Sequence, residues 1–264
     1  MSVIEILEYT GALVIGLVLG LIGGGGSILT VPLLVYLVGY NPVVATAYSL
    51  FVVGASSVIG VIEKHQKKLV DFKTGLAFSF PSFLAVYISR RFLVPNIPEA
   101  IFTINGYVLT KEMAIMVFFA VVMLIASASM IKKPSYEKLA FVKQSYYKTF
   151  IQGLVIGTVT GLIGAGGGFL YVPALVLWAG LSMKNAVGTS LVIISINSII
   201  GFLGDLHVLT IEWPFLLTFT AVTMLGVLLG GYLSKFVSNK KLKKSFGWFV
   251  LIMAIYIMIK EFSQ

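Results

Sequence analysis

The sequence has no cysteine and little charge. Charged side chains make up 11% of its 264 residues, against about 25% in soluble domains. So few charges cannot cover the surface of a soluble domain, which excludes a soluble enzyme, a coiled coil and a disordered chain. Without cysteine, the chain has no disulfide, thiol nucleophile or thiolate metal site.

Long apolar runs take up most of the chain, and 58% of its residues are hydrophobic. Runs of roughly 18 to 23 apolar residues are typical of transmembrane helices. We therefore predict an all-α polytopic protein of the cell membrane, with the lipid bilayer as a partner. The net charge of +9 is assigned to lysine-rich cytoplasmic loops rather than to nucleic-acid binding. Whether the chain forms a homo-oligomer stays open.

The chain repeats itself at an offset of 141 residues. Residues 16–72 align without a gap with residues 157–213, and about a third of the pairs are identical. Unrelated apolar segments would share about a tenth by composition, so an internal duplication is predicted. The predicted parts are a first membrane repeat (1–131), a basic cytoplasmic linker (132–148) and a second membrane repeat (149–264).

Each repeat begins with an apolar segment that is interrupted by glycines, at residues 23–26 and 164–168. Consecutive glycines should break a helix, because each costs about 1 kcal/mol relative to alanine. Each segment is either one long kinked helix or a re-entrant hairpin, and three spanning helices follow it. Hairpins would place about 15 of the 19 basic residues on one side, as the positive-inside rule requires. We therefore favour hairpins and inverted halves with both termini outside.

The glycine breaks are the candidate binding site. Non-helical backbone inside a membrane survives only where protein or a cavity satisfies it. A helix that starts after the glycines directs free N–H groups and partial positive charge at the break. Two such breaks would bind an anion without a buried basic side chain. The spaced glycines Gly16 and Gly157 are instead assigned to helix packing.

Polar residues on the following helices extend this site. Ser190 and Asn197 are two helical turns apart, so they share one face. They could donate to an anion, or they could join helices and bond back to their own backbone, and both interpretations stay open. The predicted substrate-binding residues are Gly24, Gly25, Gly26, Ser27, Gly166, Gly167, Gly168, Ser49, Ser190 and Asn197.

The remaining titratable residues suggest no catalytic or metal site. His65 and His207 are expected to be solvated at the membrane edge, and no cofactor is expected. Asp71 and its repeat equivalent Glu212 are predicted to mark helix starts. Arg90, at a helix end, is expected to snorkel to the membrane interface. With no triad or paired intramembrane carboxylate in the sequence, an enzyme is not expected.

The tracts GLIGGGGSILTVPLLV and GLIGAGGGFLYVPALV, with AVGTSLVIISINSIIG and GDLH in the second half, resemble the TauE/SafE family of sulfite and organosulfonate exporters. The resemblance covers nearly the whole chain. It implies a secondary transporter that exports a small sulfur-containing anion. The first repeat has Gly54 and Ser56 where the second has Ser195 and Asn197, so the two half-sites are expected to differ. The alternatives are a non-transporting scaffold or partner subunit and a carrier of another small ion.

Overall fold

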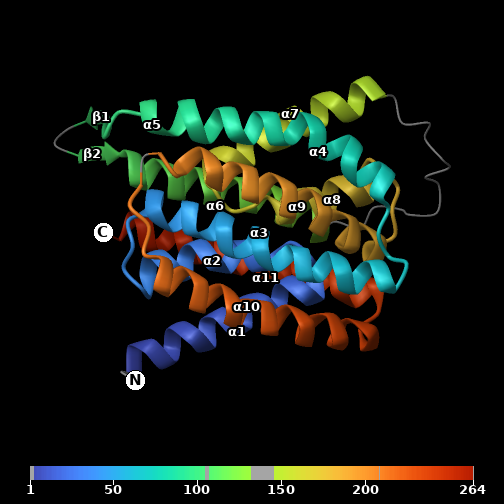
Figure 1. Ribbon diagram of the computed structural model, residues 1–264. Coiled ribbons are helices and arrows are strands. Elements are labelled where there is room, and N and C mark those ends of the chain that lie inside the picture. Colours follow the sequence, from blue (N-terminus) through green and yellow to red (C-terminus); the bar gives the residue numbers. More distant parts are fainter. Residues whose placement is uncertain (1–2, 105–106, 132–145, 208, 264) are drawn as a thin grey trace.

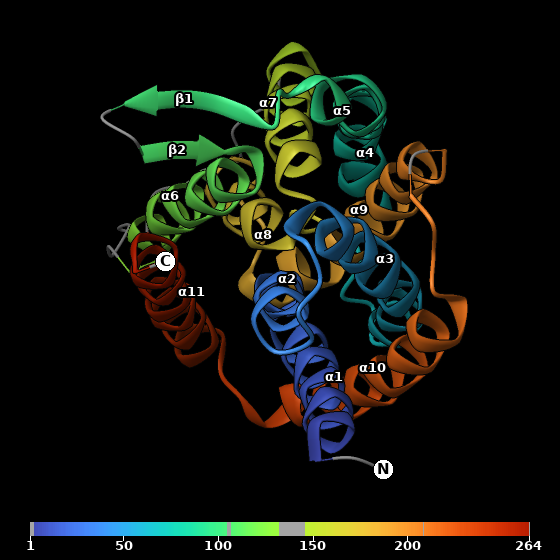
Figure 2. The same cartoon turned by 90° about the vertical axis from the view of Figure 1, so that its left-hand side faces the viewer.

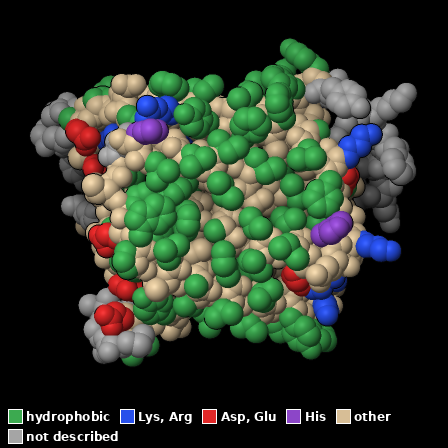
Figure 3. Space-filling view, in the orientation of Figure 1, with side chains coloured by type: hydrophobic (Ala, Val, Ile, Leu, Met, Phe, Trp, Pro, Cys, Tyr) green, Lys and Arg blue, Asp and Glu red, His purple; other side chains and the backbone are tan. Residues whose placement is uncertain are grey.

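The computed structural model describes residues 3–104, 107–131, 146–207 and 209–263, which form a bundle of helices. The long helices lie side by side across Figure 1. Within these residues, six helices are long and apolar enough to cross a membrane. On the face drawn in Figure 3, hydrophobic side chains cover the middle and charged side chains lie near both ends. The predicted all-α polytopic membrane fold is confirmed.

The first half contains α1 (Val3–Ile22), α2 (Gly25–Tyr36), α3 (Pro42–Gln66), α4 (Phe72–Ile88), the π-helical turn η1 (Ser89–Leu93), α5 (Val94–Asn96) and α6 (Lys111–Ile131). The second contains α7 (Tyr146–Ile163), α8 (Gly168–Leu177), α9 (Met183–Asp205), α10 (Trp213–Leu233), η3 (Ser234–Phe236) and α11 (Asn239–Phe262). Of the predicted linker, residues 132–145 lie outside the described residues, and the last three belong to α7.

A short antiparallel hairpin of β1 (Ala100–Ile104) and β2 (Tyr107–Thr110) precedes α6. This hairpin is not among the predicted elements. Its sequence signal is an Asn-Gly dipeptide between two runs of β-branched and aromatic residues, a pattern typical of two-residue hairpin turns.

The first Gly-rich segment is a hairpin rather than one kinked helix. Gly26, near the start of α2, packs against Leu19 near the end of α1. Farther along, Leu33 of α2 packs against Gly11 of α1. The two contacts show that α2 runs back along α1.

The second Gly-rich segment folds in the same way. Ser82 of α4 lies against Gly157 of α7, and its hydroxyl also contacts the hydroxyl of Tyr171 in α8. Residue 171 is therefore level with residue 157, so α8 turns back along α7. The hairpin geometry favoured from the basic residues is the one that the structure adopts in both halves.

Equivalent helices of the two halves form equivalent pairs. α1 packs against α10 and α4 against α7, and the offset carries one pair onto the other. Gly16 of α1 meets the backbone of Thr223 and Gly226 in α10, and Gly157 meets the backbone of Ser82 in α4. A Cβ at either glycine would collide with that backbone, so the predicted packing role of Gly16 and Gly157 is confirmed.

The equivalent helices α3 and α9 run antiparallel. Gly54 packs against Ser198, and Gly60, farther along α3, packs against Leu191, which is earlier in α9. α1 begins and α11 ends at the same end of the bundle (Figure 1). The orientation in the membrane and the inversion of the halves as a whole stay predictions.

The two ends of the bundle differ in charge. The carboxylate-rich end is the one where α1 begins, and it carries Glu112, Glu212 and Glu261, which accept hydrogen bonds from the α2–α3 connection and the end of α2. The lysine-rich end is the opposite one, and it carries Lys64, Lys67 and Lys235.

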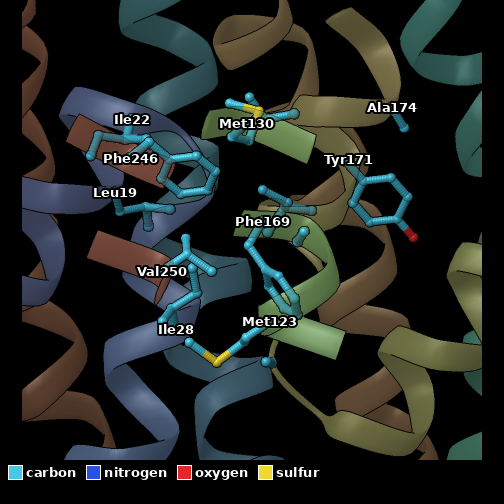
Figure 4. Packing of buried hydrophobic residues seen from close by; sticks show 14 of the residues in the cluster. Leu19, Ile22, Ile28, Met123, Met130, Phe169, Tyr171, Ala174, Phe246 and Val250 are labelled. Carbon is cyan, nitrogen blue, oxygen red and sulfur yellow. The ribbon is translucent and has the colours of Figure 1, made fainter. Parts of the chain in front are cut away.

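The larger of two hydrophobic clusters among the described residues packs around the first turns of the two short helices. In Figure 4, Phe169 at the start of α8 lies among side chains that come from α1, α2, α6 and α11. The Tyr171 hydroxyl points away from these aliphatic groups. The first turn of α8 therefore has an apolar face on one side and a polar contact on the other.

Candidate functional site

Two short helices, α2 and α8, lie near the centre of the bundle in cross-section, as the end-on view in Figure 2 shows. Gly24 is the N-cap of α2, and Gly168 is the first residue of α8. A Cβ at Gly24 would collide with the carbonyl group of Gly168, and a Cβ at Gly168 would collide with the Cα of Gly24. The two helix starts therefore touch backbone to backbone, and no side chain fits between them.

The glycines of the second break also have a conformational role. Gly166 and Gly167 have φ angles of 64° and 72°, in the left-handed region that other residues rarely adopt. Gly167 is the N-cap of α8 in this conformation. These two glycines let the chain reverse between α7 and α8 within a few residues.

The touching helix starts concentrate positive potential. The first four N–H groups of an α-helix have no acceptor within the helix, and the macrodipole places roughly half a positive charge there. α2 has 12 residues and α8 has 10, so each forms about three turns. Such a meeting point suits a small anion.

Ser198 places a hydroxyl against the second glycine break, two residues before Gly168. Its side chain is fully buried, and its Oγ has no hydrogen-bond partner among the described residues. A Cβ at Gly166 would lie 2.8 Å from that Oγ. An unsatisfied buried hydroxyl costs about 1–3 kcal/mol, so its position against the glycine break favours a polar ligand there.

Similar hydroxyls lie along α3. Ser49, Ser56 and Ser57 are fully buried, and none of their Oγ atoms has a partner among the described residues. Serines in membrane helices usually bond back to the preceding turn, and these three do not. Ser57 is the repeat equivalent of Ser198, so an unpartnered hydroxyl occurs at the same position in both halves.

Asn197 joins three helices. Its Nδ2 donates to the Ser82 hydroxyl of α4 at 2.8 Å and to the Tyr171 hydroxyl of α8 at 2.7 Å. Its Oδ1 has no partner among the described residues. The amide nitrogen therefore links α9 to α4 and α8, and the amide oxygen is left as an unused acceptor among the described residues.

Ser190 bonds to its own helix. Its hydroxyl donates to the Val187 carbonyl at 2.9 Å, which is the second of the two interpretations that the sequence left open. Ser190 and Asn197 share a face, but the hydrogen bonds of the two side chains go to different partners.

The remaining predicted residues lie at the start of α2. Gly26 packs against Leu19 of α1. Gly25 and Ser27 lie in the first turn of α2, and the contacts of these two residues are outside what the structure describes.

The expectation that Arg90 snorkels to the interface is wrong. Its side chain is fully buried, and its guanidinium is paired with Asp205 at the end of α9. Nε lies 2.8 Å from Oδ2 of that carboxylate, and Nη1 donates to the Thr46 hydroxyl at 3.2 Å. A Cβ at Gly164 would lie 3.1 Å from Nη1. A carboxylate from the other half thus lets the guanidinium stay beside the α7–α8 turn.

The predicted helix starts are confirmed. Asp71 is the N-cap of α4, and its carboxylate accepts a hydrogen bond from the Thr74 amide at 3.1 Å. Glu212 occupies the N-cap position of α10, where its carboxylate accepts from the Tyr40 hydroxyl instead. Burial, followed by this hydrogen bond, raises the pKa of Tyr40 above its ordinary value. His65 and His207 are both exposed, as expected.

Three relationships were not predicted: Tyr171 with Asn197, Ser198 with Gly166, and Arg90 with Asp205. The aligned tracts do contain a signal for the second, since Ser57 and Ser198 are identical at equivalent positions. No sequence signal pairs Arg90 with Asp205, which lie 115 residues apart.

Comparison with known proteins gives one family. The model of the family "Sulfite exporter TauE/SafE" matches residues 9–257. A "Probable membrane transporter protein" of Xylella fastidiosa (strain 9a5c) is 28% identical over 95% of this chain and 93% of its own length. The "Probable membrane transporter protein YunE" of Bacillus subtilis (strain 168) is also 28% identical, over 96% of both chains. No solved structure matches the chain.

Proposed function

Because the chain belongs to the sulfite exporter TauE/SafE family, and is thus a membrane transporter and not an enzyme, we propose that it exports a small sulfur-containing anion. Sulfite and organosulfonates are the substrates that the family name and the two glycine breaks favour together. The proposed binding site lies near the membrane midplane, where α2 and α8 begin.

The contact between Gly24 and Gly168 is the observation that carries this proposal. It brings two helix N-termini together in the apolar interior, where a partial positive charge has few competing interactions with water. Because the glycines have no Cβ, an anion can come into direct contact with the backbone N–H groups of the two helix starts. The Ser198 hydroxyl would supply a further donor to the same anion.

The geometry also sets a requirement for binding. Because the two helix starts touch, an anion between them needs α2 and α8 to move apart. Each hairpin packs mainly against helices of the other half, α1 on α10 and α7 on α4. A small shift of one helix pair relative to the other would separate Gly24 from Gly168. A movement of this kind would provide alternating access in a transporter built from repeats.

Energy would come from ion gradients, because the sequence contains no Walker loop: Gly26, not lysine, precedes Ser27. The lysine-rich loops are proposed to face the cytoplasm, with the protein in the cell membrane. Export would then run from the lysine-rich end to the carboxylate-rich end.

Flux into and out of proteoliposomes tests this function. Purified protein should move sulfite or a sulfonate such as taurine faster than protein-free vesicles do, with sulfate as the comparison anion. Repeating the assay with and without a pH gradient identifies proton coupling. Absence of flux for every anion, under both conditions, would contradict the proposal.

The unpartnered Asn197 Oδ1 and the serine hydroxyls of α3 favour one second candidate, a carrier that also binds a small cation. Neutral oxygens of this kind are ligands for Na⁺, and unwound backbone carbonyls can complete such a site. A sodium gradient in the same vesicles distinguishes the two: sodium-dependent anion flux indicates coupling, and sodium flux without an anion would replace the anion proposal.

A further inference from the structure

Lys64 is a buried cation whose counter-ion, the Glu63 carboxylate, lies beyond hydrogen-bond distance. It lies in the last turn of α3, and its side chain is 2% exposed. Its ammonium donates to the Ser234 hydroxyl at 2.8 Å, and Ser234 in turn donates to the Gly231 carbonyl. One neutral acceptor leaves two of the three N–H donors without a close partner in these contacts.

The nearest carboxylate is shared with a second lysine. Glu63 Oε2 lies 3.7 Å from the Lys64 ammonium, beyond hydrogen-bond distance. The same carboxylate contacts Lys67 closely, and Lys67 also donates to the Gly231 carbonyl at 3.0 Å. Burial and then the charge of Lys235 lower the pKa of Lys67. Two ammonium groups therefore share one carboxylate, and the cluster is net positive.

The corresponding place at the other end of the bundle is neutral. The 141-residue offset carries Lys64 onto Asp205, and it carries Arg90 onto Gly231. At the carboxylate-rich end, Arg90 and Asp205 neutralise each other. At the lysine-rich end, Gly231 has no side chain, and the Glu63 carboxylate lies against it instead. The excess positive charge is thus a property of one end alone.

Lys64 is also close to the first glycine break. Its Cβ lies 3.4 Å from the position that a Cβ at Gly188 would occupy. The preceding residue, Val187, packs against Gly23, the glycine with a φ of 76° in the α1–α2 turn. A chain of two contacts therefore joins the Lys64 side chain to the break that precedes α2.

From this arrangement, we propose that Lys64 and Ser234 form a second oxyanion site, at the lysine-rich approach to the central one. It rests on the proposed function, because it takes the same class of ligand, a compact oxyanion such as sulfite. The anion oxygens would accept hydrogen bonds from the remaining N–H groups of Lys64. The Ser234 hydroxyl would hold the ammonium in place through its own hydrogen bond. Two buried or half-buried lysines that share one carboxylate leave positive charge uncompensated, which is costly. A positive site in an apolar wall also raises the local anion concentration.

The first test replaces the charge. Lys64→Gln is compared with Lys73→Gln, which removes a charge from an exposed side chain at the same end. The readouts are half-saturation of sulfite flux from the lysine-rich side and sulfite-induced thermal stabilisation in detergent. We expect Lys64→Gln to raise the sulfite concentration for half-maximal flux about tenfold, because one charge-assisted hydrogen bond is lost. Lys73→Gln should change that concentration less than about twofold. Equal effects in both variants would overturn the proposal.

The second test predicts a gain and does not depend on the stability of the first variant. Glu63→Gln removes the carboxylate that competes with the anion for Lys64, so sulfite should bind more tightly, with half-saturation lowered about threefold. A purely structural lysine cluster would give unchanged or weaker binding, which would overturn the proposal. Failure of the proposed function is separate, because the wild-type protein would then show neither sulfite flux nor sulfite-induced stabilisation.

Discussion

Arg90 and Asp205 form a buried ion pair that connects η1, the turn after α4 in the first half, to the end of α9 in the second. The guanidinium also donates to Thr46 of α3, beside the α7–α8 turn. The pair therefore joins the two halves at the carboxylate-rich end, where substrate would leave.

Asp205→Asn should destabilise the protein strongly. It leaves the Arg90 guanidinium buried without a counter-charge, and breaking such a pair costs about 3–5 kcal/mol. Replacing both residues, as Arg90→Met with Asp205→Leu, should recover most of the stability, because no lone charge then remains. Thermal unfolding in detergent measures both variants. A double variant no more stable than Asp205→Asn would show that the pair contributes more than mutual neutralisation.

Gly16→Ala and Gly157→Ala should lower the melting temperature. Each new methyl group would meet backbone of the neighbouring helix, Thr223 in one case and Ser82 in the other, and overpacking costs about 1–3 kcal/mol. Gly75→Ala is the control, since its nearest neighbours would lie at ordinary contact distances of 3.4 and 3.6 Å. If all three variants melt at the same temperature, close backbone packing does not stabilise this bundle.

Asn197→Ala should reduce both flux and stability. It removes two hydrogen bonds, to Ser82 and Tyr171, each worth about 0.5–1.5 kcal/mol. It also removes the unpartnered Oδ1, an acceptor that the sodium-coupled alternative would use as a cation ligand. Tyr171→Phe separates the two effects, because it removes only the phenol end of the network. Normal flux in Asn197→Ala, with only a lowered melting temperature, would make this residue purely structural.

Cysteines introduced at Lys138 and Lys241 should be labelled from the same side of the membrane. The chain has no native cysteine, so each introduced thiol reports on one position. Inverted halves place both positions with the other basic residues. A membrane-impermeant maleimide applied to intact and opened cells provides the measurement. Labelling from opposite sides would contradict the inverted topology.

Sequence patterns predict the architecture well, since they depend on local physics. Apolar run length predicts the spanning helices, and the gapless offset predicts which helices are equivalent. The glycines at residues 23–26 predict a break because their helix propensity is low. The choice between kink and hairpin needed the distribution of lysines, which reports on the whole chain.

Side-chain partners could not be predicted in the same way. Whether Ser190 donates to its own helix while Ser198 stays unpartnered depends on the rotation of α9 against α3 and the α7–α8 turn, which no residue spacing encodes. Arg90 has the long charged side chain and the helix-end position that are typical of a snorkelling residue. Its burial depends on Asp205, which is far away in the sequence but adjacent in the structure. The tight packing of α2 on α1 also makes Gly26→Ala a poor test of the anion site. The new methyl group would collide with Leu19, so the variant would disturb folding as well as any anion binding.

Ser198→Ala measures whether an anion binds at the glycine breaks of α2 and α8. The variant removes a buried hydroxyl that has no partner among the described residues, so it should fold with a melting temperature at or above that of the wild type. Ser127→Ala, whose hydroxyl bonds to its own helix in α6, is the matched control. We expect Ser198→Ala to raise the sulfite concentration for half-maximal flux about fivefold or more, because it removes about one hydrogen bond to the anion. Half-saturation equal to that of the wild type and of Ser127→Ala would contradict an anion site at the meeting point of α2 and α8.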